Sequence, residues 1–263
     1  MIIRIKKESD FNKSDLVMPY SLFPYANYSF YGLNKKIFSL YKTGNCFFSK
    51  YDDSIQICSE TINEDQLNDI SDFIQSKKIR MVTAKPEIAS KLANTLDNNN
   101  LSYGKEDGYI FEINIFDQNN TDVLITAKHK EDFRQMAHIV CLANSNNPNF
   151  YREKQLYRQY YKRASSGYCR NFFVKKNNSM IGCISTYCET NNYCVIGGLA
   201  VHPNFQKRGY GRKLFLGALN KLASESKKIF LFCYNENLLE FYSQYSNKQI
   251  AISKILISKQ TTS

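Results

Sequence analysis

In the second half of the chain, hydrophobic residues recur with two periods, one typical of strands and one of helices. Apolar residues three or four positions apart, such as Phe133, Met136 and Val140, predict a helix over 131–143. Further helices are expected over 152–164, 210–224 and 238–245. Short apolar or alternating runs predict strands over 123–126, 171–175, 180–187, 193–201, 229–233 and 250–257. The pattern by itself indicates a mixed α/β fold.

The first half shows a weaker pattern of the same kind. Residues 1–6 alternate like a strand, and three runs suggest a meander over 36–41, 45–51 and 54–59. A helix is expected over 64–76, followed by a strand, a helix and a strand over 79–83, 86–96 and 109–115. We therefore expect a second, smaller α/β domain at the N-terminal end.

Aromatic residues gather between Pro19 and Tyr31. Such a cluster is typical of packing in a core or between domains. A lining for a substrate site is the alternative interpretation.

Charge is distributed unevenly along the chain. Residues 1–120 carry 14 Lys and Arg against 16 Asp and Glu, whereas residues 121–263 carry 21 against 8. This change favours a boundary near Asn119 and Asn120, with domains over 1–119 and 120–263. The excess positive charge of the second half suits an anionic partner.

Composition narrows the class of protein. The chain is 43% hydrophobic and 22% charged, which is typical of a globular fold. No apolar run approaches the roughly 20 residues that span a bilayer, and no secretory signal is evident at the start. We expect a cytoplasmic protein. The eight cysteines form no C-x-x-C pair and the three histidines are scattered, so no metal site is expected.

The strongest chemical signal follows the apolar run 195–201. After His202 and Pro203, residues 206–211 read Gln-Lys-Arg-Gly-Tyr-Gly and open the helix expected from 210. Backbone N–H groups at a helix start have no partner inside the helix, and the helix dipole adds positive charge there. Gly209 and Gly211 carry no side chain that would keep an anion away. The segment therefore predicts a diphosphate site.

The segment from Val201 to Gly211 resembles the acetyl-CoA signature of the GNAT family of N-acetyltransferases. Its fixed positions, Val, Pro, Gln or Arg, Gly, and Gly or Ala, are all filled here in the same spacing. A second segment, in which Asn235 precedes Tyr242 by seven residues, resembles the family's closing signature. Leu238 replaces the usual Ala, and the usual Gly-Phe after the Tyr is missing. The resemblance covers residues 122–258.

The resemblance implies an α/β (α+β) fold with a mixed, mostly antiparallel sheet flanked by helices. It also implies an acetyl-CoA-dependent N-acetyltransferase in which an amine attacks the thioester directly. The N-terminal half resembles a degenerate, partial copy of the same fold, without the glycine loop.

The resemblance also assigns roles to residues of this chain. The Leu199 N–H would polarise the thioester carbonyl, and the Tyr242 phenol would protonate the departing thiolate. Asn235 would bind the coenzyme arm or only cap its helix. The full set expected to contact acetyl-CoA is Leu199, Ala200, Val201, Gln206, Lys207, Arg208, Gly209, Tyr210, Gly211, Arg212, Asn235 and Tyr242.

The general base is not identified by the sequence. Strand 193–201 carries no carboxylate, although some family members have a Glu there. Glu189 is the nearest acid and is expected to be an exposed turn residue. His202 stands where the family often has a His without a catalytic role. Proton loss through water, or binding of a neutral amine, remains open.

The segment 151–163 mixes basic and aromatic residues. A solvated helix face, a site for an acidic acceptor and a nucleic-acid surface are three interpretations. A CoA-binding regulatory module without activity is the main alternative to an enzyme. The acceptor amine and a homodimeric state are left open, and no membrane partner is expected.

Overall fold

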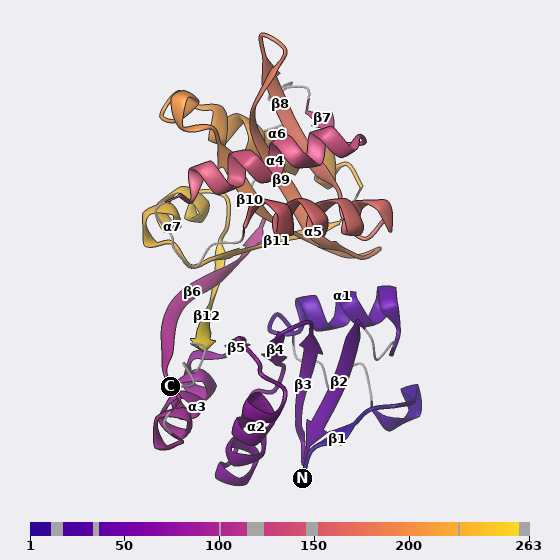
Figure 1. Ribbon diagram of the computed structural model, residues 1–263, viewed down its shortest axis with the longest axis vertical. Coiled ribbons are helices and arrows are strands. Elements are labelled where there is room, and N and C mark those ends of the chain that lie inside the picture. Colours follow the sequence, from indigo (N-terminus) through magenta and orange to yellow (C-terminus); the bar gives the residue numbers. More distant parts are fainter. Residues whose placement is uncertain are drawn as a thin grey trace. The chain divides into compact units, whose positions relative to one another are not determined.

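The computed structural model describes residues 1–11, 18–33, 37–99, 101–114, 124–145, 152–225 and 227–257. Contacts group the chain into two compact units (Figure 1). Unit 1 comprises Met1–Phe111, Cys233–Phe241 and Gln249–Ser263, and unit 2 comprises Glu112–Phe232 and Tyr242–Lys248. The C-terminal segments are thus shared between the units.

The boundary expected at Asn119 and Asn120 lies outside the described residues. The contacts place the passage between the units at Phe111 and Glu112, and they return two later segments to unit 1. Domains over 1–119 and 120–263 stay a prediction.

The sheet of unit 1 is mostly antiparallel. Strands β1, β2, β3 and β4 form an antiparallel meander, β4 pairs with β5 in parallel, and β12 pairs antiparallel with β5. Strand β6 follows β12 in the order. The bounds are β1 (Ile3–Arg4), β2 (Phe38–Thr43), β3 (Cys46–Tyr51), β4 (Ser54–Ile57), β5 (Met81–Ala84), β6 (Tyr103–Ile113) and β12 (Lys248–Ile257).

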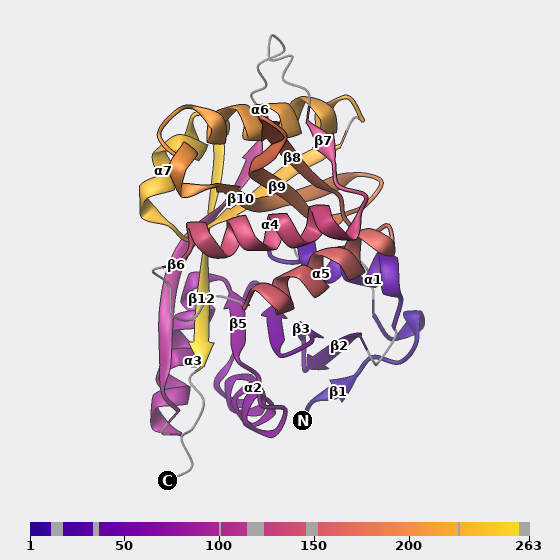
Figure 2. The ribbon, with the colours of Figure 1, turned by 45° about the horizontal axis from the view of Figure 1, so that its top comes forward.

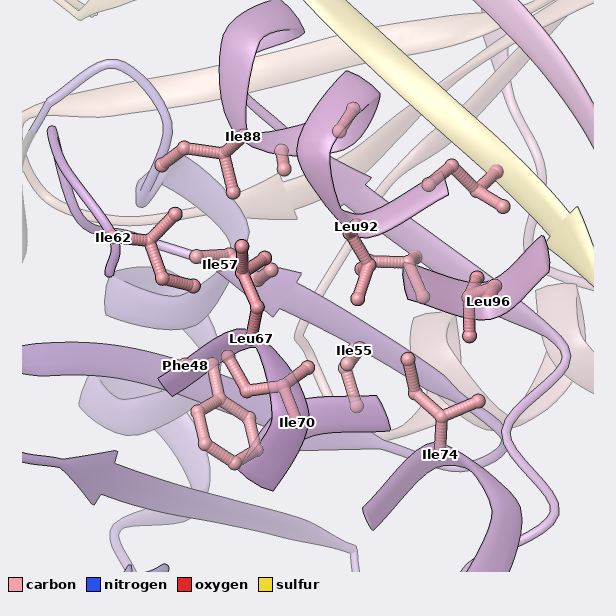
Figure 3. Close-up of a cluster of buried hydrophobic side chains, with 14 of the residues drawn as sticks. Phe48, Ile55, Ile57, Ile62, Leu67, Ile70, Ile74, Ile88, Leu92 and Leu96 are labelled. Atoms are coloured by element: carbon pink, nitrogen blue, oxygen red, sulfur yellow. The ribbon is translucent and has the colours of Figure 1, made fainter. Parts of the chain in front are cut away.

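Helices cover both faces of this sheet. Phe48 and Ile57 belong to the core beneath α2 (Glu64–Ser76) and α3 (Pro86–Asn98). Their neighbours Phe47 and Cys58 belong to a second core with α1 (Leu22–Tyr31). Adjacent strand residues point to opposite faces, so the two cores lie on opposite sides. Figure 3 shows α2 and α3 side chains gathered around the strands in the first core.

The aromatic cluster from Pro19 to Tyr31 contains helix α1, which the sequence pattern does not predict. Its Tyr28 is buried and lies edge-on to Phe11, with ring centroids 5.3 Å apart. Pro24 is tolerated because it falls in the first turn, where backbone N–H groups have no helical partner. The interpretation of the cluster as core packing is confirmed.

The sheet of unit 2 runs in the order β11-β10-β9-β8-β7. Strands β7 to β10 are antiparallel to their neighbours, and β10 pairs with β11 in parallel. Helices α4 and α5 cover one face and α6 the other (Figure 2). The bounds are β7 (Ile125–Thr126), α4 (Lys130–Ala143), α5 (Glu153–Ser165), β8 (Asn171–Lys176), β9 (Ser179–Glu189), β10 (Tyr193–Val201), α6 (Tyr210–Ala223), β11 (Lys228–Cys233) and α7 (Glu236–Ser243).

The predicted order of elements in the second half is confirmed from β7 to β12. Helix α7 begins two residues before the expected 238, because the Asn235 side chain caps it: its Oδ1 accepts a hydrogen bond from the Asn237 N–H at 3.0 Å. Strand β6 starts at Tyr103 instead of 109, because a polar stretch is drawn into the sheet. Within the described residues, no helix has the length and apolar character needed to cross a membrane.

Candidate functional site

The site begins with a bulge in strand β10. Gly197 pairs with Ser185 of β9, and Ala200 pairs with Cys183, so β10 advances by one residue more than β9. Gly198 takes up the extra length with a φ of +63°, a conformation that favours glycine. The paired glycines therefore accommodate a bulge in this strand.

Strands β10 and β11 part at the same place. Their parallel pairing runs from Tyr193 with Lys228 to Ile196 with Leu231, and among the described residues it goes no further. Strand β10 continues to Val201, and Gly197, Gly198 and Leu199 are half-buried. The strand therefore presents a partly exposed edge beyond Ile196.

A short loop connects this edge to helix α6. His202 caps a 3-10 helix over Pro203–Phe205 by accepting a hydrogen bond from the Asn204 N–H at its Nδ1. The Gln206 side chain donates to the Val201 carbonyl oxygen at 3.0 Å. Gln206 thus fixes the loop back onto the end of the strand.

The start of α6 is open. Gly209 is the N-cap in a left-handed conformation with φ of +81°, and a Cβ placed on it would meet nothing within 4 Å. The first helical bond runs from the Lys213 N–H to the Gly209 carbonyl at 3.1 Å. Among the described residues, the N–H groups of Tyr210, Gly211 and Arg212 precede that bond and have no partner. This geometry fits an anion.

Unit 1 contains a comparable helix start that is closed. Helix α2 also joins two parallel strands, but its N-cap is Asn63, whose side chain accepts a hydrogen bond from the Gln66 N–H at 2.9 Å. The Gln66 side chain in turn accepts from the Asn63 N–H at 3.0 Å. A capping box of this kind engages the N–H group of the third helical residue, which in α6 has no partner among the described residues.

Cations and aromatic rings surround the open loop. The Arg208 guanidinium lies 5.8 Å from the ring centroid of Phe205. The Lys176 ammonium, from the β8–β9 turn, lies 6.0 Å from Phe205 and 5.9 Å from Tyr210. Sequence reasoning missed Lys176, because nothing in the local pattern of that turn relates it to a loop some 30 residues later. Together these groups make the surroundings of Gly209 positive.

Tyr242 lies in the core beside α6. Its side chain is buried, and its ring is edge-on to Phe215 of α6 at 5.3 Å between centroids. Tyr245 packs on the same ring at 5.1 Å. Asn235 belongs to unit 1 and caps α7, so of its two expected roles the capping role is observed.

Glu189 is not the exposed turn residue that we expected. Its side chain is 12% exposed and lies at the centre of an ion-pair cluster. Arg170 donates two hydrogen bonds to it, at 2.8 and 2.7 Å, Thr186 donates one at 2.7 Å, and Lys227 donates one at 3.1 Å. Burial opposes the charged carboxylate, but the bonds from Arg170 and Thr186 outweigh it and lower the pKa of Glu189. A carboxylate held in this way is a poor general base.

The aromatic residues of α5 are used inside unit 2. Tyr157 and Tyr161 stack 6.1 Å apart, and the Arg134 and Lys130 side chains of α4 lie over them at 5.5 and 5.7 Å. Rings covered by cations of the same fold do not offer free faces to bases. The packing favours a helix–helix interface over a nucleic-acid surface. Tyr151 lies outside the described residues.

Comparison with family models identifies this part of the chain. Residues 135–245 match the model of the Acetyltransferase (GNAT) family. The segment is a GNAT acetyltransferase domain, and the resemblance predicted from the glycine loop is confirmed for it. A comparison with curated proteins finds no match.

Solved structures share the fold of both units. A Drosophila protein is 11% identical, with 98% of each chain covered and a TM-score of 0.67. A GCN5-related N-acetyltransferase from Kribbella flavida is 9% identical over 93% of this chain and 96% of that chain, with a TM-score of 0.59. A GNAT-family acetyltransferase from Colwellia psychrerythraea is 10% identical over 98% and 100%, with a TM-score of 0.54. The predicted fold class, with its additional N-terminal α/β unit, is confirmed.

Proposed function

We propose that the chain is an N-acetyltransferase that transfers the acetyl group of acetyl-CoA to a primary amine. The observation that carries this proposal is the open, positively surrounded start of α6 directly after the bulged end of β10. At the start of α2, by contrast, the Asn63 side chain already engages the N–H group of the third helical residue.

The donor would be held mainly by backbone groups. The free N–H groups at the start of α6 would bind the diphosphate, with Lys207, Arg208 and Arg212 adding charge. The edge of β10 from Leu199 to Val201 would pair with the amide groups of the pantetheine arm. Gln206 supports this edge through the Val201 carbonyl.

The acyl group would lie at the bulge. Acetyl-CoA supplies an activated thioester, and the Leu199 N–H, turned by the bulge, would donate to its carbonyl oxygen as charge develops there. Fixing the amine and the thioester in one geometry contributes a further part of the rate, on the order of 7–11 kcal/mol in well-oriented systems. Tyr242 would give its phenolic proton to the sulfur as it leaves.

Measurement of free thiol release from acetyl-CoA over a broad panel of amines tests the proposal. Tyr242→Phe should lower kcat by roughly 100-fold or more while acetyl-CoA binding, measured by calorimetry, stays unchanged. Tyr245→Phe is the matched control, because Tyr245 is equally buried and packs on the same Phe215 ring. It should retain the wild-type rate.

An inactive CoA-binding module is the second candidate. It is favoured by the absence of a carboxylate from β10 and by the engagement of Glu189 in ion pairs. Acetyl-CoA binding without thiol release on any amine, with the same result for the Tyr242 and Tyr245 variants, would select this alternative and reject the enzyme.

A further inference from the structure

Two tyrosine hydroxyls converge on the bulge of β10. A Cβ placed on Gly198 would lie 3.2 Å from the Tyr160 Oη and 3.2 Å from the Tyr187 Oη. At Gly197 a Cβ would lie 2.8 Å from the Cε2 atom of the Tyr187 ring. The glycine pair therefore does more than permit the bulge, because it also admits two phenols to the backbone beside Leu199.

Buried polar side chains of unit 2 hold the Tyr160 hydroxyl in place. Tyr160 is buried on α5, and its hydroxyl interacts with the Ser185 hydroxyl of β9. Ser185 donates its own proton to the Asn171 Oδ1 at 2.7 Å, and both residues are almost fully buried. Buried hydrogen-bonded groups of this kind hold a side chain in one orientation. Tyr187, by contrast, is half-buried and borders the exposed edge.

Within the described part of the chain, the polar side chains recorded beside the bulge are those of Tyr160, Tyr187 and Ser185, and none is a carboxylate. Strand β10 has none, and Glu189 is ion-paired. The groups that act electrostatically on the Tyr160 hydroxyl are Tyr187, Cys183 and the Arg163 cation. An ammonium ion placed here would lose its hydration without a compensating anion. A neutral amine would instead find two phenol oxygens as hydrogen-bond acceptors.

We propose that Tyr187 and Tyr160 form the binding site of the acceptor amine and select an amine that enters uncharged. This inference rests on the proposed acetyltransferase function. Tyr187 and Tyr160 both contact the amine, and Ser185 is the positioning residue that holds the Tyr160 hydroxyl. The phenol oxygens accept the N–H hydrogen bonds and direct the nitrogen lone pair at the thioester carbon.

The transfer balances with these groups. The nitrogen lone pair forms the N–C bond, the C–S bond breaks, and sulfur leaves with the electron pair and takes the Tyr242 proton. The surplus proton on nitrogen passes to water. Water then returns a proton to the Tyr242 oxygen, and the phenol is restored. Tyr187 and Tyr160 accept hydrogen bonds throughout and change neither charge nor oxidation state.

A binding site for uncharged amines predicts that the enzyme prefers an α-amine to an ε-amine. Free α-amino groups titrate near pH 8 and ε-amino groups near pH 10.4, so at neutral pH the first supply far more uncharged amine. Nε-acetyl-lysinamide and Nα-acetyl-lysinamide present one amine of each kind on the same skeleton. At pH 7 we expect kcat/KM to favour the free α-amine on the order of 100-fold.

The test combines this pair of substrates with three variants. Tyr187→Phe should raise the KM of the α-amine and lower kcat/KM about tenfold, while the dissociation constant of acetyl-CoA and the melting temperature stay as in the wild type. Tyr160→Phe should lower kcat more than it changes KM. Tyr161→Phe, its neighbour on α5 that packs on Phe133, is the control and should change neither.

The outcomes separate the two proposals. Failure of the wild type to acetylate either amine, or any other in the panel, contradicts the acetyltransferase function. Turnover that is unaltered in Tyr187→Phe, or that favours the ε-amine at pH 7, contradicts the amine-binding role of the two tyrosines. It does not contradict the acetyltransferase function.

Discussion

Gly209 and Gly167 share a backbone conformation and differ in what surrounds them. Their φ angles are +81° and +76°, both residues are exposed, and a Cβ on either would meet nothing within 4 Å. A side chain at either position therefore costs the same left-handed strain, about 1–2 kcal/mol. The two positions separate the role of Gly209 in binding from its role in the backbone.

Gly209→Glu should weaken acetyl-CoA binding on the order of 100-fold, or ~2.7 kcal/mol, because the new carboxylate occupies the helix N-terminus and repels the diphosphate. Gly167→Glu should lower the melting temperature about as much as Gly209→Glu does, because the backbone strain is the same. It should leave acetyl-CoA binding unchanged. Calorimetric titration of both variants with acetyl-CoA measures the difference. Equal affinities in the two variants would remove the α6 start from the coenzyme site.

At the scale of elements, the Glu189 cluster joins the residue before β8, the end of β9 and the segment between α6 and β11. Arg170 bridges Glu189 and Glu225, and Lys227 contacts both carboxylates. Glu189→Gln removes the negative charge that pairs with Arg170 and Lys227. We therefore expect the free energy of unfolding to fall by about 1–3 kcal/mol. Glu131→Gln, which removes the exposed pair with Arg134, should cost no more than about 0.5 kcal/mol.

The contribution of Glu189 depends on pH in a defined direction. The cluster lowers the pKa of Glu189, so its stabilisation is present above the unfolded value, about 4.3, and is lost as pH falls through the lower folded value. Denaturant unfolding at several pH values should show wild type and Glu189→Gln converging below pH ~4. A difference that stays constant between pH 7 and pH 3 would mean that the cluster contributes through packing and not through charge.

Local patterns foretold the elements better than the contacts between them. The largely apolar runs of 180–187 and 193–201 are sufficient to indicate β9 and β10, and the glycines of the loop indicate the open helix. The ion pairing of Glu189 cannot be predicted from the local sequence, because its partners Arg170 and Lys227 come from other parts of the chain. Helix α1 was missed because its aromatic residues lack a clear period, and the pairing of β12 with β5 is a long-range contact that no local pattern encodes.

At the scale of the whole molecule, the chain contains two units that each join parallel strands through a helix. In unit 1 the connection is β4-α2-β5, and in unit 2 it is β10-α6-β11. The two helices start differently, since Asn63 fills the N-terminus of α2 with its side chain and Gly209 leaves that of α6 open. Of these two helix starts, that of α6 is therefore the one we assign to the diphosphate.

We therefore expect calorimetry to give one acetyl-CoA per chain. Asn63→Ala removes a cap and should cost about 1 kcal/mol of stability, without a change in acetyl-CoA affinity or stoichiometry. Combining it with Gly209→Glu should weaken binding no further than Gly209→Glu does alone, while the stability losses add, because the two substitutions lie in different compact units. A second binding event in the wild type, or a binding defect in Asn63→Ala, would show that unit 1 also holds the coenzyme. If neither is seen, the N-terminal unit keeps the strand–helix–strand connection without binding the coenzyme, and its helix start is capped by the Asn63 side chain.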